Sequence, residues 1–580
     1  MVYNVSFQKL FFYIMLMVCY PVSVCVAYTL PVGIPSPISY FEGFDPINSA
    51  APVVNVNGTS IKCPNWPNAA NSGCYYIDNT NPKATDTDNP YGYPNKPRLT
   101  IPEIAYNAGD FIYINGGIYN PAGDRFNWGG VGTSTKPIWL CGNPKNKPSF
   151  IGFVHFYIKT DYFIMDNIRF PSGGYIDIRP TDPNVQVKHL VIRNCFFEGK
   201  QNSSDYSTIS VGQSTGEPLP QTYVSDVVIF NNLMKNYGDK YKTEECGIYM
   251  GYPTERLWVL NNEIHSYGAD GIAGCHNADH KAKYAKYYFI GGNKIYGNGE
   301  NGIDLKAIQN YIISQNELYG PHYREGGASI VLHYGANGVG CTNGWVIFNK
   351  IHDAGAGIAI TDVDFDTNVI GNIIYNLLTP STIDNLDGSA IGFRGVNGNL
   401  IITNNTIYGF TRYGIVSDQQ TFTAGTSINI ENNIIVNSQN GEYSLLIKGA
   451  SKQVSLKNNQ YYNTNGSVHI FWGNAPRTLD YMKFIGQSQN SGEGIPGFVN
   501  PPYDFSLKPD SPCIDKGFES VAYSKFFAEY SINIKKDFKG VTRPQGNGWD
   551  VGAYEYISEA NNKNGKLAPP QNITIKVESN

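Results

Sequence analysis

The sequence predicts an all-β fold: a right-handed parallel β-helix, a solenoid of about ten or more coils, with an N-terminal cap and a small C-terminal module. Three observations predict it. The chain has 580 residues, which is too many for one compact core and suits a repeat architecture. Its middle repeats one pattern, in which an apolar strand meets an asparagine and a second short strand follows. Only 16% of its residues are charged, while 61 are glycine and 42 are tyrosine.

Residues 1–27 are expected to form a signal peptide. Lys9 supplies a positive charge, Leu10 to Cys19 is an apolar stretch, and Ala27 is a small residue suited to cleavage. The apolar stretch is too short to cross a membrane comfortably. We therefore expect cleavage near Ala27, a secreted or cell-surface location, and no membrane insertion after cleavage. A lipoprotein attached through Cys19 or Cys25 is the alternative.

The balance of charge bounds the kind of partner. The formal net charge is −5, and removal of Lys9 with the signal peptide makes it −6. Because a nucleic-acid-binding protein normally carries a basic excess, no nucleic-acid partner is expected.

Residues 28–135 are expected to form the N-terminal cap and the start of the solenoid, because an open solenoid end exposes unpaired strand edges. Cys63 and Cys74 flank a loop rich in proline and asparagine, and they are expected to form a disulfide in an oxidising compartment. The remaining cysteines are scattered and form no CxxC pair. We therefore interpret them as small buried hydrophobic residues rather than zinc ligands.

Residues 136–500 are expected to form the solenoid itself. Aligning the second strand of each repeat on its first inward residue gives a mean spacing of about 28 residues, through Ile248, Ile272, Ile303, Ile330, Ile358, Ile391, Ile415 and Leu445. Strands of three to five residues cannot hold a sheet alone, but winding them into coils pairs each strand with its copy one turn away. The isoleucines should then stack into one continuous core.

An asparagine recurs at one corner of each coil: Asn262, Asn293, Asn316, Asn349, Asn372, Asn405 and Asn433. Asparagine tolerates left-handed backbone angles, and its amide can bond the amide of the next coil. These asparagines are therefore expected to be structural rather than ligands for a substrate.

Residues 501–556 are expected to form a module that flanks the end of the solenoid, with Asp515, Asp537 and Asp550 in structural roles. Residues 557–580 form a polar tail with a Pro-Pro break.

These segments resemble a known family. The runs NNEIHSYGADGI and NKIYGNGENGIDLKAIQNYIISQNELYG resemble the pectin-lyase-like superfamily of right-handed β-helices. The segment YDFSLKPDSPCIDKGF and the following DFKGVTRPQGNGWDVGAYEY resemble the terminal module of secreted β-helix proteins. The resemblance covers roughly residues 100 to 556. It implies the fold more strongly than an activity, since members include lyases, hydrolases, epimerases, esterases and non-catalytic adhesins.

Narrower motifs of the superfamily are absent. The Asn-Thr-Asp, Asp-Asp and Gly-His-Gly motifs of polygalacturonases do not occur, and neither does the W-x-D-H motif of the main pectate lyases. The strand GIDLK (Gly302 to Lys306) looks like the strand that carries the base in some uronate lyases.

The repeat predicts which side chains face outward. If Ile303 and Leu305 point into the core, Asp304 and Lys306 point out, because alternate residues of a strand face opposite sides. The same offset in each coil gives an outer column of Gly251, Cys275, Lys306, His333, Thr361, Arg394, Asp418 and Lys448. Lys306, His333 and Arg394 should therefore lie on one outer face.

This column suits β-elimination of a uronate. A base must remove the proton at C5, and a cation must neutralise the sugar carboxylate. We expect Lys306 to be the base, with its pKa lowered by the neighbouring cations, and His333 and Arg394 to share the site. Tyr334 is a candidate proton donor to the leaving oxygen.

Further residues are candidates around this column. Ca²⁺ could aid neutralisation, with Asp270, Glu300 and Asp304 as its oxygen ligands. Asp304, His322, Arg324 and Trp345 are candidates for binding substrate. Trp128, Trp139 and Trp258 could also stack on sugars, although packing in the core or at corners is favoured for most of the tryptophans.

The sequence therefore predicts a secreted lyase that acts on an acidic, uronate-containing polysaccharide. A non-catalytic surface protein or adhesin that binds carbohydrate is the alternative, and a glycoside hydrolase comes third because no paired carboxylates stand out. The glycan, its linkage and the oligomeric state stay open.

Overall fold

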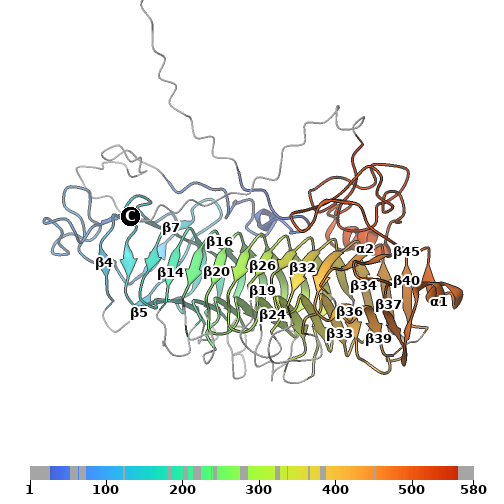
Figure 1. Ribbon diagram of the computed structural model, residues 1–580. Coiled ribbons are helices and arrows are strands. Elements are labelled where there is room, and N and C mark those ends of the chain that lie inside the picture. The colour runs from blue at the N-terminus through green and yellow to red at the C-terminus, as the bar shows by residue number, and fades with distance from the viewer. Residues whose placement is uncertain are drawn as a thin grey trace, which may run out of the picture.

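A computed structural model gives the three-dimensional structure of the chain (Figure 1). It describes residues 27–558 except 53–62, 64–72, 122–124, 181, 183–184, 200–206, 213–223, 237, 239–243, 252, 275–284, 321–326, 336–337, 364–365, 379–386, 440 and 450–451. The predicted signal peptide except Ala27 and most of the polar tail lie outside the described residues.

Three long sheets run the length of the molecule, and most coils add one strand to each sheet in turn (Figure 1). Sheet 1 has 17 strands. They are β1 (Cys74–Ile77), β2 (Ala105–Asn107), β3 (Phe111–Ile114), β6 (Gly129–Val131), β7 (Ile138–Gly142), β10 (Thr160–Asp166), β13 (Val187–Arg193), β16 (Val224–Phe230), β19 (Thr254–Leu260), β22 (Ala285–Gly291), β25 (Gln309–Ser314), β28 (Thr342–Ile347), β31 (Thr367–Ile370), β34 (Asn399–Thr403), β37 (Ser427–Glu431), β40 (Val454–Lys457) and β44 (Ser488–Gln489).

Sheets 2 and 3 have 14 strands each. Sheet 2 consists of β4 (Ile118–Tyr119), β8 (Ser149–Phe150), β11 (Arg169–Phe170), β14 (Phe196–Glu198), β17 (Leu233–Lys235), β20 (Glu263–His265), β23 (Lys294–Tyr296), β26 (Glu317–Tyr319), β29 (Lys350–His352), β32 (Ile373–Leu377), β35 (Thr406–Phe410), β38 (Ile434–Asn437), β41 (Gln460–Asn463) and β45 (Gly492–Glu493). Sheet 3 consists of β5 (Arg125–Asn127), β9 (Phe153–His155), β12 (Ile176–Ile178), β15 (Ile209–Val211), β18 (Ile248–Met250), β21 (Ile272–Gly274), β24 (Ile303–Lys306), β27 (Ile330–His333), β30 (Ile358–Thr361), β33 (Ile391–Arg394), β36 (Tyr413–Ser417), β39 (Tyr443–Ile447), β42 (Ile470–Trp472) and β43 (Ala475–Arg477).

The predicted parallel β-helix and its register are confirmed. In sheet 3 the parallel register pairs Ile303 with Ile330, Ile330 with Ile358, and Ile358 with Ile391. These side chains are all buried in one cluster that runs along the solenoid. A single shared core is therefore built one layer at a time from side chains contributed by successive coils.

The first parallel strand pairs of the solenoid lie before residue 136, within the segment expected to hold its start. Strand β1 already pairs in parallel with β3, and β3 with β7. The residues before β1 also differ from a simple end cap, because residues 28–49, which we call the strap, lie along the outer face of sheet 1. There Trp258 Nε1 donates to Pro35 O at 2.9 Å, and Arg193 donates to Pro46 O and Ile47 O at 3.1 and 3.0 Å.

The strap lies on sheet 1 because that sheet's outer face is unusually apolar. Trp139, Trp258, Phe289 and Trp345 belong to a buried cluster outside the main core. The strap covers part of this cluster with Ile34, Phe41 and Ile47. All the tryptophans proposed as candidates for sugar stacking are thus packed inside the protein, as favoured for most of them, and Trp128 is fully buried in the main core.

The C-terminal region closes the solenoid and flanks it. Helix α1 (Leu479–Phe484) adds Leu479 and Met482 to the main core. Helix α2 (Val521–Tyr530) and the hairpin of β46 (Phe498–Asn500) and β47 (Asp504–Leu507) pack against the sides of sheets 1 and 2 (Figure 1). Helix α2 and β47 fall within residues 501–556, and β46 directly precedes them.

The three aspartates of this module are structural, as predicted. Asp515 Oδ1 accepts from Gly548 N at 2.7 Å. Asp537 Oδ1 accepts from Val541 N at 2.7 Å, and Asp550 Oδ2 accepts from Tyr556 N at 2.6 Å. Their carboxylates accept hydrogen bonds from backbone amides and so stabilise the loops of the module.

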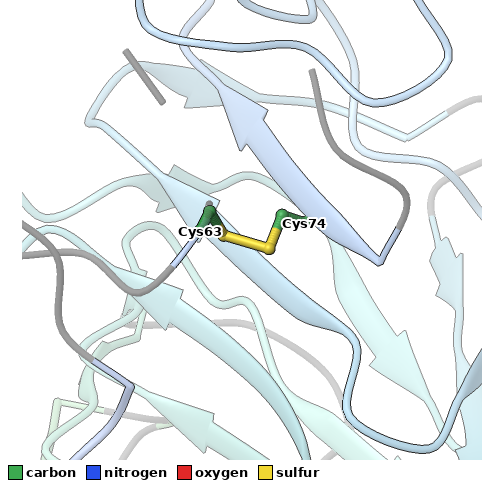
Figure 2. The surroundings of a disulfide bond; sticks show 2 residues. All are labelled: Cys63 and Cys74. Carbon is green, nitrogen blue, oxygen red and sulfur yellow. A yellow bond between two sulfur atoms is a disulfide. The ribbon is translucent and has the colours of Figure 1, made fainter. Parts of the chain in front are cut away.

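The predicted disulfide is confirmed. Cys63 and Cys74 are bonded, with their Cα atoms 6.1 Å apart (Figure 2). It joins the start of β1 to the segment before it. The five other cysteines of the described residues are free and buried, in agreement with their interpretation as small hydrophobic residues. No helix among the described residues is long and apolar enough to cross a membrane.

The corner asparagines form one continuous hydrogen-bonded ladder. At each step the side-chain oxygen of one asparagine accepts both the backbone N–H and the amide N–H of the asparagine one coil earlier; Asn316 Oδ1, for example, accepts from Asn293 at 3.0 and 2.9 Å. Asn316 Nδ2 in turn donates to Ile290 O and to Asn349 Oδ1. The ladder runs from Asn232 to Asn459. It gives hydrogen-bond partners to buried polar groups at the turns that would otherwise have none.

The left-handed backbone falls on a different residue from the one predicted. None of the ladder asparagines has a positive φ. The residue before each of them does: Asn231, Asn261, Gly292, Gln315, Phe348, Gly371, Asn404, Asn432 and Asn458. The preceding residue therefore makes the sharp turn, and this leaves the ladder asparagine in an ordinary conformation from which its amide reaches the next coil.

Replacing one ladder residue should destabilise the solenoid. N316A would leave the buried N–H of Asn293 and the carbonyl of Ile290 without side-chain partners. We expect a loss of about 3 kcal/mol, measured as a lowered midpoint of urea unfolding. N500A, at an exposed position of β46, is the control and should change the midpoint little. Equal midpoints for N316A and wild type would show that the ladder contributes no stability.

Candidate functional site

One buried carboxylate organises the outer face of sheet 3. Asp304 on β24 bonds Lys306 Nζ at 2.6 Å and His333 Nε2, from the next coil, at 2.8 Å. The strand register pairs Lys306 directly with His333. The Asp304 side chain is 2% exposed, whereas those of Lys306 and His333 are 13% and 24% exposed. The carboxylate thus lies beneath its two partners, and they face outward.

The predicted lowering of the Lys306 pKa is wrong. Burial alone would lower the pKa of Lys306, but the neighbouring Asp304 carboxylate outweighs burial and raises it. Burial would likewise raise the pKa of Asp304, but the hydrogen bond from His333 and the charge of Lys306 lower it to about 2. Lys306 is therefore held as a cation by an ionised Asp304, and the lowering by cationic neighbours that would make it a base does not occur.

The same carboxylate fixes the proton on His333. An ionised carboxylate only accepts hydrogen bonds, so His333 Nε2 must carry the hydrogen that it shares with Asp304. In the neutral imidazole, the lone pair then lies on Nδ1. No described residue bonds that nitrogen, and the ring is partly exposed. The arrangement can therefore present an oriented proton acceptor beside a fixed positive charge.

Tyr334 and Arg394 flank this pair at different distances. Tyr334 is 44% exposed, and its ring meets that of His333 edge to face at 6.2 Å. Arg394 pairs with Thr361, whose strand directly follows that of His333. Arg394 therefore lies on the predicted column, three strands from Lys306. At about 4.8 Å per strand, its backbone is about 14 Å from that of Lys306. The register of Lys306, His333, Thr361 and Arg394 within the column is confirmed, and Arg394 lies too far along the sheet to touch Lys306.

Two of the carboxylates predicted to bind Ca²⁺ are engaged by other side chains. Both oxygens of Asp304 are taken by Lys306 and His333. Asp270 is fully buried, and its Oδ1 accepts from the backbone and the side chain of Asn301 at 3.1 and 2.9 Å. No group of three His, Cys, Asp or Glu side chains among the described residues could hold a metal ion.

The acidic neighbours instead repel one another. Burial raises the pKa of Glu300 to about 7, and the charges of Asp270, Asp304 and Glu244 add to this effect. Glu300 therefore titrates near neutrality. Glu300 alone does not make the carboxylate pair of a glycoside hydrolase, because Asp304 and Asp270 are too deeply buried to reach a sugar.

Three further candidates lie elsewhere. Trp345 is on β28 of sheet 1, where Phe526 packs on it at 4.8 Å and Nε1 donates to Glu529 Oε2 at 3.3 Å. It is covered by helix α2 and is no longer a candidate for binding substrate. His322 and Arg324 lie outside the described residues.

Sequence reasoning missed the central role of Asp304. It placed this residue among metal ligands and substrate contacts, whereas its carboxylate bridges two side chains of neighbouring coils. The signal was present in the spacing: residues two apart on a strand share a face, and the repeat already set His333 beside Lys306.

Comparison with known proteins identifies no family for the chain. No protein-family profile and no curated protein sequence matches the chain. Among solved structures, pectate lyase Pel9A is 14% identical with a TM-score of 0.38. The match covers 83% of this chain and 96% of the Pel9A chain. Alginate lyase AlyF-OU02, in complex with G6, is 14% identical with a TM-score of 0.42, and the match covers 76% of this chain and 92% of the lyase chain. The Streptococcus pneumoniae surface protein and adhesin PfbA is 12% identical with a TM-score of 0.41, and the match covers 66% of this chain and 91% of the PfbA chain.

The parallel β-helix of this chain is shown by its own strand pairings. Neither the lyase nor the adhesin activity follows from it for this chain.

The raised pKa of Glu300 predicts how stability depends on pH. Its folded pKa, about 7, lies above its usual value of 4.5. The folded state therefore binds more protons than the unfolded state between these values, and stability should fall as pH rises through that window. In E300Q this fall should be smaller by about 2 kcal/mol, measured by urea unfolding at pH 4.5 and pH 8. Parallel curves for E300Q and wild type would contradict it.

Proposed function

We propose that the protein is a polysaccharide lyase that cleaves an acidic, uronate-containing glycan by β-elimination at Asp304, Lys306 and His333. The observation that carries this proposal is the pairing of a permanent cation and an oriented imidazole on one buried carboxylate. Such a pair supplies the two groups that the reaction needs, and it lies on the outer face of a long solenoid that a polymer can follow.

The steps follow from the chemistry of each group. The ammonium of Lys306 pairs with the sugar carboxylate, which makes the proton at C5 more acidic. His333 Nδ1 takes that proton, and the electrons of the C5–H bond form a double bond between C4 and C5. The bond from C4 to the glycosidic oxygen breaks, and the Tyr334 hydroxyl, on the exposed side of His333, protonates the leaving oxygen.

This assignment exchanges two roles predicted from the sequence. Lys306 neutralises charge, because Asp304 raises its pKa, and His333 becomes the base. Asp304 is a positioning residue that touches neither the sugar nor its proton. Arg394, further along the column, is suited to the carboxylate of another sugar of the same chain.

Activity is tested on a panel of polygalacturonate, alginate and glycosaminoglycans. The ultraviolet absorbance of the unsaturated uronate product reports elimination. Each substrate is assayed with added Ca²⁺ and with a chelator, so that a requirement for the ion is detected. We expect at least one acidic glycan to be cleaved. Binding without cleavage of any glycan would instead support the non-catalytic, adhesin-like alternative.

Removing the base should abolish elimination while the fold is kept. H333A should lower kcat by about 10²- to 10⁴-fold, the usual contribution of a general base, and D304N should lower it in the same direction by freeing the imidazole. K508A, an exposed lysine of the C-terminal module, is the control and should retain full activity. Full activity in H333A would remove His333 as the base.

Lys306 can be tested for its electrostatic role by keeping its charge. K306R should retain part of the activity that K306A loses, because an arginine still neutralises a carboxylate but cannot act as a base. The measurement is kcat at saturating substrate, with folding checked by circular dichroism. Equal, complete loss in K306R and K306A would instead identify Lys306 as the base.

A further inference from the structure

A second set of the same three residue types lies on the same outer face. Asp177 on β12 occupies the register position of Asp304, since the parallel pairs run through Ser210, Tyr249 and Ala273 to Asp304. Arg179, two residues after Asp177, corresponds to Lys306. His155, paired with Asp177 from the preceding coil, supplies the imidazole.

The contacts of this set are looser than those at Asp304. Arg179 Nε lies 3.3 Å from Asp177 Oδ1, and His155 Nε2 lies 3.9 Å from Asp177 Oδ2. Burial raises the pKa of Asp177 despite both neighbours, and burial lowers the pKa of His155. The tight pairing that holds Asp304 ionised and orients His333 is therefore missing here, and the set is poorly suited to proton transfer.

Arg179 is instead available to a ligand. Its side chain is 39% exposed, and its contact with Asp177 lacks hydrogen-bond geometry. The buried Arg193 provides a contrast, because its guanidinium is spent on Asp166 and on carbonyls of the strap. A guanidinium presents a planar fork of donors that matches a carboxylate, and it stays charged at any physiological pH.

An aromatic pair lies on the same outer face, four residues before Arg179 along the strand. Phe153 of β9 stacks on Tyr175, which directly precedes β12, with ring centroids 4.4 Å apart and planes 6° apart. Both rings are partly exposed. Such rings present apolar surface and a hydroxyl on the same face as the guanidinium, about 13 Å along the strand, so that neighbouring sugars of one acidic glycan chain can meet both.

We propose that Arg179, with Phe153 and Tyr175, forms a second binding subsite for a uronate residue of the glycan chain. It lies four strands from Asp304, or about 19 Å along the solenoid at the usual strand spacing. A polymer lying along sheet 3 would meet both places, while a short oligosaccharide would reach only one. The subsite therefore anchors long chains, and its link to cleavage rests on the proposed lyase function.

The test measures binding apart from cleavage. Retardation in native gels that contain polygalacturonate or alginate gives dissociation constants in an H333A background, where the polymer stays intact. Adding R179Q should weaken binding about fivefold or more, and R179K should have an intermediate effect because it keeps the charge and loses the fork. The control is R169Q, which removes a half-exposed arginine from the outer face of sheet 2 and should change nothing. Circular dichroism confirms folding of each variant.

Kinetics in the otherwise wild-type protein give a second readout. R179Q should raise KM for the polymer, while the same variant should keep its KM for a trisaccharide. Cleavage together with unchanged polymer binding in R179Q would overturn the second subsite and leave the lyase proposal standing. Binding that depends on Arg179 without any cleavage would support the subsite and overturn the lyase proposal. Absence of binding to either polymer would overturn the subsite.

Discussion

The hydrogen bonds between successive coils are the constraint on which the rest of the structure depends. They fix each strand at one spacing from its copy, and they fix which residue of one coil lies beside which residue of the next. A slip of one residue would turn Lys306 into the apolar core and Ile303 out to solvent. The asparagine ladder holds that register at one corner, because each amide fits only when neighbouring coils are aligned. The chemistry at Asp304 therefore follows from the backbone register as much as from the side chains themselves.

Much of the fold could be predicted from the sequence because the repeat carries it. The inward column from Ile248 to Leu445 is the register that the structure shows, since apolar residues at a fixed offset leave no other way to bury them. The ends of the repeat were harder. The strap carries no repeat of its own, and its place on sheet 1 depends on an apolar outer face that is contributed by tryptophans of several coils. Likewise, the residue with the left-handed backbone was assigned one position too late, because both members of the Asn-Asn pairs tolerate that conformation.

At the candidate site the repeat predicts which residues share a face, but it does not predict the contacts between their side chains. The repeat placed Lys306, His333 and Arg394 on one face, and this was right. It could not give side-chain rotamers, so it did not show that Asp304 folds back beneath Lys306 and His333. That one contact reverses the expected direction of the pKa shift of Lys306. Trp345 failed for a related reason, because its cover comes from helix α2, almost two hundred residues further along the chain.

The strap also constrains the order in which the molecule can be completed. Val32 is bonded to Ser314 and Gln315, and Gly33 lies against Ile347 of β28 and Phe526 of α2. The part of the chain that is synthesised early is thus seated on surfaces made hundreds of residues later. The region around Gly33 can complete its contacts only after helix α2 has been made. Its seating closes the assembly by joining the two ends of the chain on one side of the solenoid.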